Sequence, residues 1–148
     1  MSWRCPNAVS LGVAELPEYE LAFRTHADIR PTTGSYMEVV LWEITDECLA
    51  ALDQLEGYPT YYTRYEVDVF HDNRWKKALV YKMNYGELAL PSAGYLRMLV
   101  EGYSDHGCDL RQLYDAIDDA EKHEILTNYP DFGYNYNPSN EIQYEPYL

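Results

Sequence analysis

The sequence of 148 residues is long enough to form one domain around a single hydrophobic core, and no second core is needed. Its 25 acidic residues against 11 Lys and Arg give a net charge of −14, which opposes binding to nucleic-acid phosphates and to anionic membranes. We therefore expect neither nucleic acid nor a membrane as a partner, and nothing in the composition indicates the oligomeric state.

Three cysteines, Cys5, Cys48 and Cys108, are far apart and outside any C-x-x-C spacing, so they indicate neither a disulfide framework nor a zinc site. They are typical of reduced, partly buried thiols. The sequence has no basic-then-apolar leader and no run of 18 apolar residues. Together these features predict a soluble, cytoplasmic, acidic protein.

The first part of the chain has β-strand character. Pro17, Pro31 and the turn signal TTGS at 32–35 separate three short runs of this kind, at residues 8–16, 19–23 and 36–44. A helix is predicted next, capped by Thr45 or Asp46 and ended by Gly57, with an apolar stripe that comprises Cys48, Leu49, Leu52 and Leu55.

The pattern then returns to a period of two. The runs RYEVDVF and KKALVYKM flank the polar segment HDNRW at 71–75, which predicts an antiparallel hairpin. After Pro91 and Ser92 a helix is predicted that stops near Gly107. A last helix, capped by Asp109, has the apolar positions Leu110, Leu113, Tyr114 and Ile117.

Strands gathered in the first half and helices in the second predict an α+β domain with a mostly antiparallel sheet. We place this domain at residues 1–128. Residues 129–148, which are rich in Tyr and Asn and have no periodicity, are predicted to form a tail or a strap over the body.

Glu56 is the residue whose chemistry the local sequence makes most interesting. A carboxylate at the C-terminal end of a helix lies among unpaired carbonyls, which raises its pKa, and burial by neighbouring tyrosines would raise it further. A pKa closer to neutrality suits a group that takes up a proton and returns it. The alternative is a solvated acid at a helix end. Asp53, three residues earlier, is read as an exposed helix residue.

A series of segments resembles the γ-glutamylcyclotransferase family in order and in spacing. The most specific are the combination LDxxEG and Y-x-R within residues 52–67, followed by PSxxYL at 91–96. The remaining segments are RCPNA (4–8), LPEYELAF (16–23), ADIRPTTGS (27–35), VVLWEIT (39–45) and ALVYKM (78–83). The resemblance covers residues 4–109.

This resemblance implies a compact α+β fold with a small, mixed or antiparallel, β-barrel-like sheet flanked by helices. It also implies a small-molecule γ-glutamyl substrate, which cyclises to 5-oxoproline and releases an amine or amino acid, without a cofactor or a metal. The position that matches the family's catalytic acid is Glu56. Tyr62, Tyr95 and Arg64 are expected to bind substrate, although two of them fit as packed tyrosines and Arg64 fits as a surface residue beside Glu66.

The sequence departs from the family in one respect, because the family's first strand and its Y-G-S-N loop, which hold the γ-glutamyl group and the developing oxyanion, are missing before RCPNA. Either the true start lies upstream of Met1, or the loop is lost. In the second case we expect a catalytically impaired protein that acts as a small-ligand-binding or protein-interaction module.

Overall fold

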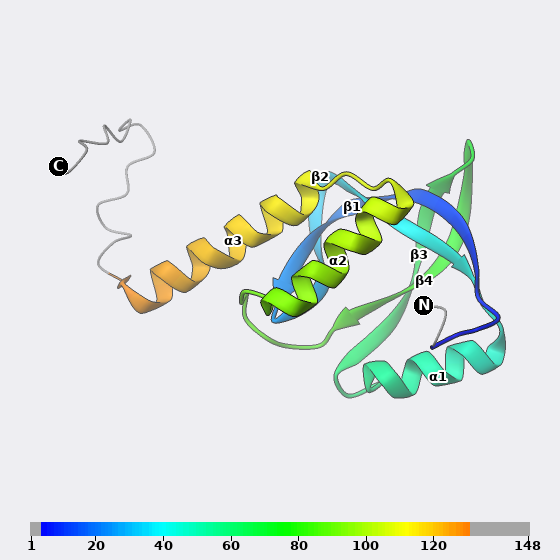
Figure 1. Cartoon of the computed structure of the whole chain (residues 1–148), viewed down its shortest axis with the longest axis horizontal. Coiled ribbons are helices and arrows are strands. Elements are labelled where there is room, and N and C mark those ends of the chain that lie inside the picture. The colour runs from blue at the N-terminus through cyan, green and yellow to red at the C-terminus, as the bar shows by residue number, and fades with distance from the viewer. Residues whose placement is uncertain (1–3, 131–148) are drawn as a thin grey trace.

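The computed structural model of the protein describes residues 4–130. Within this range the elements follow one another as β1 (Val9–Arg24), β2 (His26–Glu43), α1 (Asp46–Glu56), β3 (Tyr62–His71), β4 (Arg74–Met83), α2 (Ala93–His106) and α3 (Arg111–Asn128). The expected α+β class is confirmed, with one antiparallel sheet and helices around it (Figure 1). From residue 131 onward the predicted tail lies outside the described residues.

The first two strands are longer than predicted and run through both prolines. They pair along their whole length as one antiparallel hairpin, from Val9 opposite Glu43 to Arg24 opposite His26. The expected strand ends are instead an irregularity inside the hairpin, because residues 32–35 stand opposite Glu18. Glu18 and Gly34 both have left-handed φ values, 62° and 80°, and the Gly34 N–H donates to Glu18 Oε2 at 3.0 Å. The proline and glycine signals therefore mark a bulge.

The second hairpin is as the sequence predicts. β3 and β4 pair in register from Tyr62 opposite Met83 to His71 opposite Arg74. The two turn residues, Asp72 and Asn73, have φ values of 50° and 59°, which is the backbone of a tight hairpin turn whose twist matches the strands. The hairpin joins the sheet through β3, which lies beside β1.

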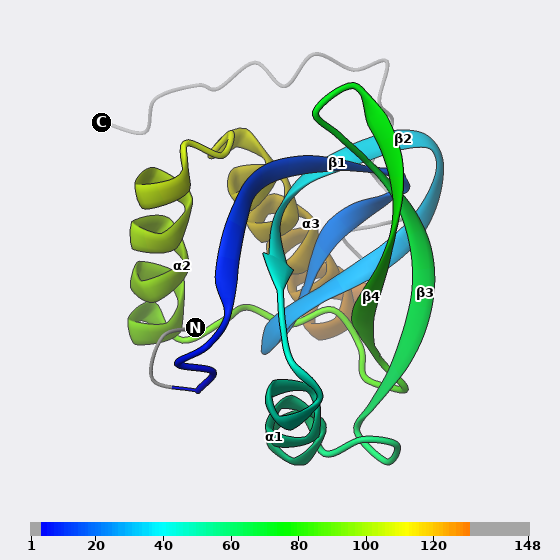
Figure 2. The same cartoon turned by 90° about the vertical axis from the view of Figure 1, so that its right-hand side faces the viewer.

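The sheet has the order β2-β1-β3-β4. Its edge strands, β2 and β4, do not pair with each other, so the sheet is open and the prediction of a barrel-like sheet is wrong on this point. A side chain joins the two edge strands instead. The carboxylate of Asp28 on β2, which is 3% exposed, accepts a hydrogen bond from the Met83 N–H at the end of β4 at 2.8 Å. Its other oxygen lies 2.9 Å from Nε of Arg24. Figure 2 shows the strong bend of the strands that allows this approach.

Helices α1 and α2 begin and end where the sequence predicts. Thr45 and Ser92 accept hydrogen bonds from the first turns of α1 and α2, and Gly57 and Gly107 end them with left-handed φ values. Leu55, however, which was assigned to the apolar stripe of α1, is exposed.

Two clusters of buried side chains form the core. One lies within the bent sheet and comprises Ala14, Leu16, Ile29, Met37 and Val69. The other packs the sheet against α2 and α3 and comprises Phe23, Leu113, Ala116 and Ala120.

Helix α3 uses most of the predicted face, because Leu113 is buried and Leu110 and Ile117 pack against the core, whereas the fourth predicted position, Tyr114, does not. Tyr114 is 58% exposed, and small alanines line the buried face because the helix lies close to β1. Asp109 precedes α3 and accepts a hydrogen bond from the Arg111 N–H at 2.9 Å. Beyond its last buried residue, Ala120, the helix extends away from the body (Figure 1).

We expect Asp28→Ala to lower the free energy of unfolding by about 2–3 kcal/mol, because it leaves the partly buried Met83 N–H and Arg24 without their acceptor. Asp28→Asn keeps an oxygen for Met83 and should cost less. Urea denaturation monitored by circular dichroism measures both changes. Asp118→Ala, on the exposed side of α3, is the control for loss of one acid, and equal midpoints for Asp28→Ala and Asp118→Ala would contradict the assignment.

Candidate functional site

Glu56 is the last residue of α1, and the chain reverses directly after it. Gly57 takes a left-handed φ of 64°, and the Tyr58 N–H donates back to the Asp53 carbonyl at 2.9 Å. A Cβ atom on Gly57 would lie 2.5 Å from Cδ2 of Tyr61. Glycine is therefore required both by the backbone angle and by the close approach of Tyr61, so the Glu-Gly pair is a structural unit.

The structure brings two of the expected binding residues to the backbone of one residue. Tyr62 begins β3 and Tyr95 lies in the first turn of α2, yet both contact Ala27 on β2. The Tyr62 hydroxyl donates to the Ala27 carbonyl at 3.5 Å, and the Ala27 N–H donates to the Tyr95 hydroxyl at 3.0 Å. The ring of His26 packs edge-on against Tyr95, with ring centroids 5.0 Å apart.

Two residues of this group, His26 and Tyr62, interact electrostatically with Glu56. Burial raises the pKa of the Glu56 carboxyl, while electrostatic interactions with Arg4 and His26 act in the opposite direction. Burial, together with the charge of Glu56, raises the pKa of Tyr62 to about 12. The pKa of Tyr81 on β4 is also raised, first by burial and then by its hydrogen bond to Asp53. The acid is therefore easier to protonate than an exposed one, and the tyrosines stay protonated donors.

Arg64 belongs to a neighbouring cluster. Its Nε lies 3.3 Å from Oδ1 of Asp53, and its Cζ lies 4.5 Å from the centroid of the Tyr58 ring. The Tyr81 hydroxyl donates to the same oxygen of Asp53 at 2.6 Å. Asp53, which the sequence suggested to be exposed, is therefore half-buried and paired. This cluster fixes the last turn of α1 to the β3–β4 hairpin.

Several residues that contact the expected site residues, the end of β4 or the loop after Glu56 were not singled out from the sequence: His26, Ala27, Asp28, Tyr81 and Asn84. No signal in the sequence marks Asp28, because its neighbours on the same side of the strand, His26 and Arg30, are also polar. Nor does any signal mark Asn84, whose hydrogen bonds all go to residues at least 21 positions away in the sequence.

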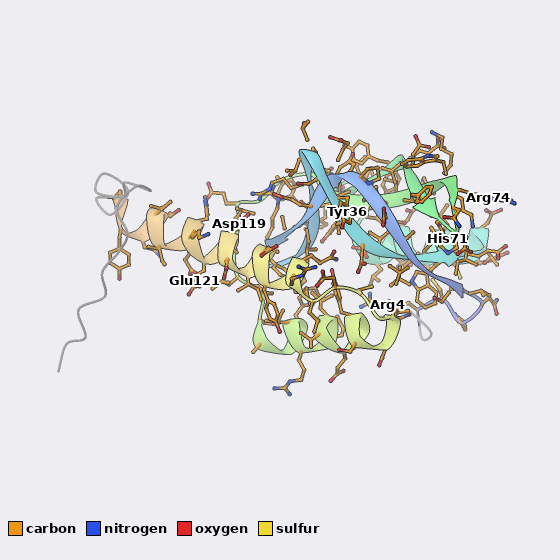
Figure 3. The ribbon with its side chains drawn as sticks, turned by 90° about the horizontal axis from the view of Figure 1, so that it is seen from above. Arg4, Tyr36, His71, Arg74, Asp119 and Glu121 are labelled. Carbon is orange, nitrogen blue, oxygen red and sulfur yellow. The ribbon has the colours of Figure 1, made fainter. Side chains whose placement is uncertain are left out.

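A cavity of about 150 Å³ lies elsewhere, between the β1–β2 hairpin and α3. Figure 3 shows two of its lining residues, Tyr36 and Asp119, apart from the hairpin tip marked by His71 and Arg74. Two of its acids, Glu20 and Asp119, are paired with Arg30, so their charge is already partly neutralised. None of the residues expected from the sequence to act on substrate lines it, and we place the candidate site at Glu56.

Across residues 4–130, no group of three or more His, Cys, Asp or Glu side chains gathers in a way that could hold a metal ion. No helix in the same range combines the length and the apolar character needed to cross a membrane. Cys5, Cys48 and Cys108 are free thiols, of which the first two are buried, as the sequence predicts.

Comparison with known proteins gives consistent matches. The family described as "Gamma-glutamyl cyclotransferase, AIG2-like" matches residues 1–98. A solved structure described as "Gamma-glutamyl cyclotransferase" is 25% identical, with a TM-score of 0.69 over 78% of this chain and 76% of that one. The same values hold for the uncharacterized protein loc79017 from Homo sapiens. YkqA from Bacillus subtilis, at 24% identity, shares the fold with a TM-score of 0.62 over 81% of this chain and 45% of its own. No curated protein matches the chain.

The raised pKa of Glu56 predicts a specific dependence of stability on pH. A carboxyl whose pKa is higher in the folded state stabilises the fold at low pH, and this contribution is lost as the pH rises from the unfolded value, about 4.3, through the folded value. Relative to the wild type, Glu56→Gln should therefore gain stability as the pH rises from 4 to 7.

Urea denaturation at intervals of one pH unit measures this difference. Glu121→Gln, on the exposed part of α3, corrects for the general effect of removing one negative charge. If the two variants show parallel pH profiles, Glu56 is not a buried acid.

Proposed function

The chain belongs to the γ-glutamyl cyclotransferase, AIG2-like family, and on that premise we propose that it converts γ-glutamyl amino acids, peptides or amines into 5-oxoproline and a free amine. The observation that carries the proposal is Glu56 itself. It is a partly buried carboxyl with a raised pKa, and tyrosines from β3 and β4 and a histidine from β2 lie within its electrostatic range.

In the proposed reaction Glu56 moves one proton from nitrogen to nitrogen. The ionised carboxylate removes a proton from the α-ammonium group of the substrate, and the freed amine attacks the γ-carbonyl carbon. A ring C–N bond forms, Glu56 returns the proton to the leaving nitrogen, and the bond to that nitrogen breaks. The ring nitrogen still carries one proton too many after the attack, and it gives this proton to the released amine, which leaves as an ammonium ion. The enzyme ends in its starting state, and no cofactor is consumed. Both reactants belong to one molecule, so the protein mainly holds them in attack geometry.

The tyrosines suit the binding part of this role. The hydroxyls of Tyr62 and Tyr95 both lie at the backbone of Ala27, and the raised pKa of Tyr62 keeps its hydroxyl protonated at neutral pH. A protonated hydroxyl can donate to a substrate carboxylate or carbonyl. We propose that both residues bind the γ-glutamyl group.

For Arg64 we propose a contribution to substrate binding that acts through its neighbours. Its guanidinium is paired with Asp53 and stacked on Tyr58, so it supports the last turn of α1 and the residue that follows Gly57. A direct contact with a substrate carboxylate would compete with the pairing to Asp53.

The second candidate is a module that binds a γ-glutamyl ligand without turnover. The observation in its favour is that the Ala27 N–H, a backbone donor close to the site, is already bonded to the Tyr95 hydroxyl and is not free to stabilise an oxyanion. The two candidates differ in whether 5-oxoproline is released.

We expect the protein to release 5-oxoproline from a panel of γ-glutamyl amino acids, γ-glutamyl peptides and γ-glutamylamines, measured by liquid chromatography with mass detection. Glu56→Gln keeps the shape of the side chain but cannot carry a proton between the two nitrogens, so kcat should fall by at least about 100-fold. Glu121→Gln serves as the control with an equal change in charge.

The outcome separates the candidates. Saturable binding of γ-glutamyl ligands by calorimetry with no 5-oxoproline from any of them would favour the binding module. Turnover that is equal in the wild type and in Glu56→Gln would remove Glu56 from the mechanism.

A further inference from the structure

The loop after Glu56 is a tight turn that carries carbonyl groups available to the rest of the protein. It spans residues 57–61 and leads from α1 into β3. The N–H groups of Thr60 and Tyr61 both donate to the Gly57 carbonyl, at 2.8 and 2.9 Å, which closes the turn. These bonds leave the carbonyls of Pro59, Thr60 and Tyr61 to be satisfied from outside the turn.

One residue supplies all three partners. The side-chain Nδ2 of Asn84 donates to the carbonyls of Pro59 and Thr60, at 2.7 and 2.8 Å. Its backbone N–H donates to the Tyr61 carbonyl at 2.9 Å. The remaining polar atom of the side chain, Oδ1, accepts from the Thr63 hydroxyl at 2.6 Å. Asn84 therefore clamps the loop from its third residue into the start of β3.

The segment that contains Asn84 is itself held by the first hairpin. The preceding residue, Met83, donates its N–H to the buried carboxylate of Asp28, and the guanidinium of Arg24 bonds to both Asp28 and the Gly86 carbonyl. This hairpin also carries Ala27, the residue that both site tyrosines contact. Hydrogen bonds, together with the backbone from Ala27 to Asp28 and from Met83 to Asn84, thus link the tyrosine side of the site to the loop on the acid side.

We propose that Asn84 is a positioning residue of the candidate site: through its side-chain amide it holds the loop after Glu56, and so fixes the acid relative to Tyr62. As far as catalysis is concerned, this inference rests on the proposed function. Asn84 acts on the loop and is not assigned a contact with substrate. Because the clamp lies on an exposed loop, water can replace its bonds when the side chain is shortened, and the fold survives while the loop becomes mobile.

If the Asn84 clamp only stabilises the fold, its removal leaves the pKa of Glu56 unchanged. If the clamp positions the acid, its removal changes that pKa. A mobile loop admits water to Glu56, and hydration lowers the pKa of a carboxyl that burial has raised. The charged and titratable groups that act on Glu56 are Arg4 before β1, His26 on β2, Tyr62 on β3 and Tyr81 on β4. A neutral substitution at Asn84 alters none of them.

The test compares Asn84→Ala and Asn84→Ser with Asn128→Ala, a matched loss of an exposed asparagine at the end of α3. We expect kcat to fall by about 10- to 100-fold with KM changed by less than about threefold, because misplacement of a catalytic group affects the chemical step. The acid limb of the kcat profile should move to lower pH. Amide exchange of Thr60 and Tyr61 should be faster, and the carboxyl resonance of Glu56 should titrate at lower pH.

Each remaining outcome overturns the inference or separates it from the proposed function. If the Asn84 variants match Asn128→Ala in kcat, amide exchange and Glu56 titration, Asn84 is a turn residue with no positioning role. The same holds if they lose stability but keep the acid limb in place. If the wild type releases no 5-oxoproline, the proposed function fails. Amide exchange and Glu56 titration then decide the positioning role alone, and unchanged values overturn it.

Discussion

The buried carboxylate of Asp28 is the interaction on which the arrangement of the site depends. The sheet is open, and no ladder of backbone hydrogen bonds joins β2 to β4. Asp28 takes the place of such a ladder by accepting the last N–H of β4 and pairing with Arg24. A buried carboxylate is stable only when its oxygens are bonded in this way, so its neighbours are fixed together with it. The end of β4 and the tip of the first hairpin therefore form one rigid unit.

The sequence predicted those elements whose ends are set by capping and turn residues next to them in the chain. Thr45 and Gly57 bound α1, Ser92 and Gly107 bound α2, and Asp72 with Asn73 turns the second hairpin. The length of the first two strands was not predictable in this way. Proline and glycine disfavour regular strands. Here, however, residues 32–35 form a bulge opposite Glu18, which has a left-handed φ, and the two strands pair on both sides of this bulge. The bulge depends on Glu18 in the partner strand β1, so the sequence of residues 32–35 alone does not predict that the strand continues.

The candidate site likewise contains residues that the sequence indicates and residues whose contacts depend on distant parts of the chain. Glu56, Tyr62 and Tyr95 were proposed because the motifs around them resemble a family, and the structure brings both tyrosine hydroxyls to the backbone of Ala27. The partner of Arg64 was not predicted, because Asp53 lies eleven positions earlier, on a helix, and approaches only when α1 packs on the hairpin. Asn84 gives no signal for the same reason, since its bonds reach back more than twenty residues.

The position of Glu56 at a helix end now has a physical explanation. The helix fixes the backbone of the acid, and the left-handed Gly57 then reverses the chain, so that Tyr62 returns into electrostatic range of the carboxyl after only six residues. Burial in this reversal raises the pKa of Glu56, and an ionised carboxylate there is correspondingly unfavourable for the fold. The hydrogen bonds that stabilise the loop go to its backbone carbonyls and not to the Glu56 carboxyl, so they hold the loop whether Glu56 is ionised or protonated. The acid thus remains available for a proton, while the geometry around it is set by groups that do not titrate near neutral pH.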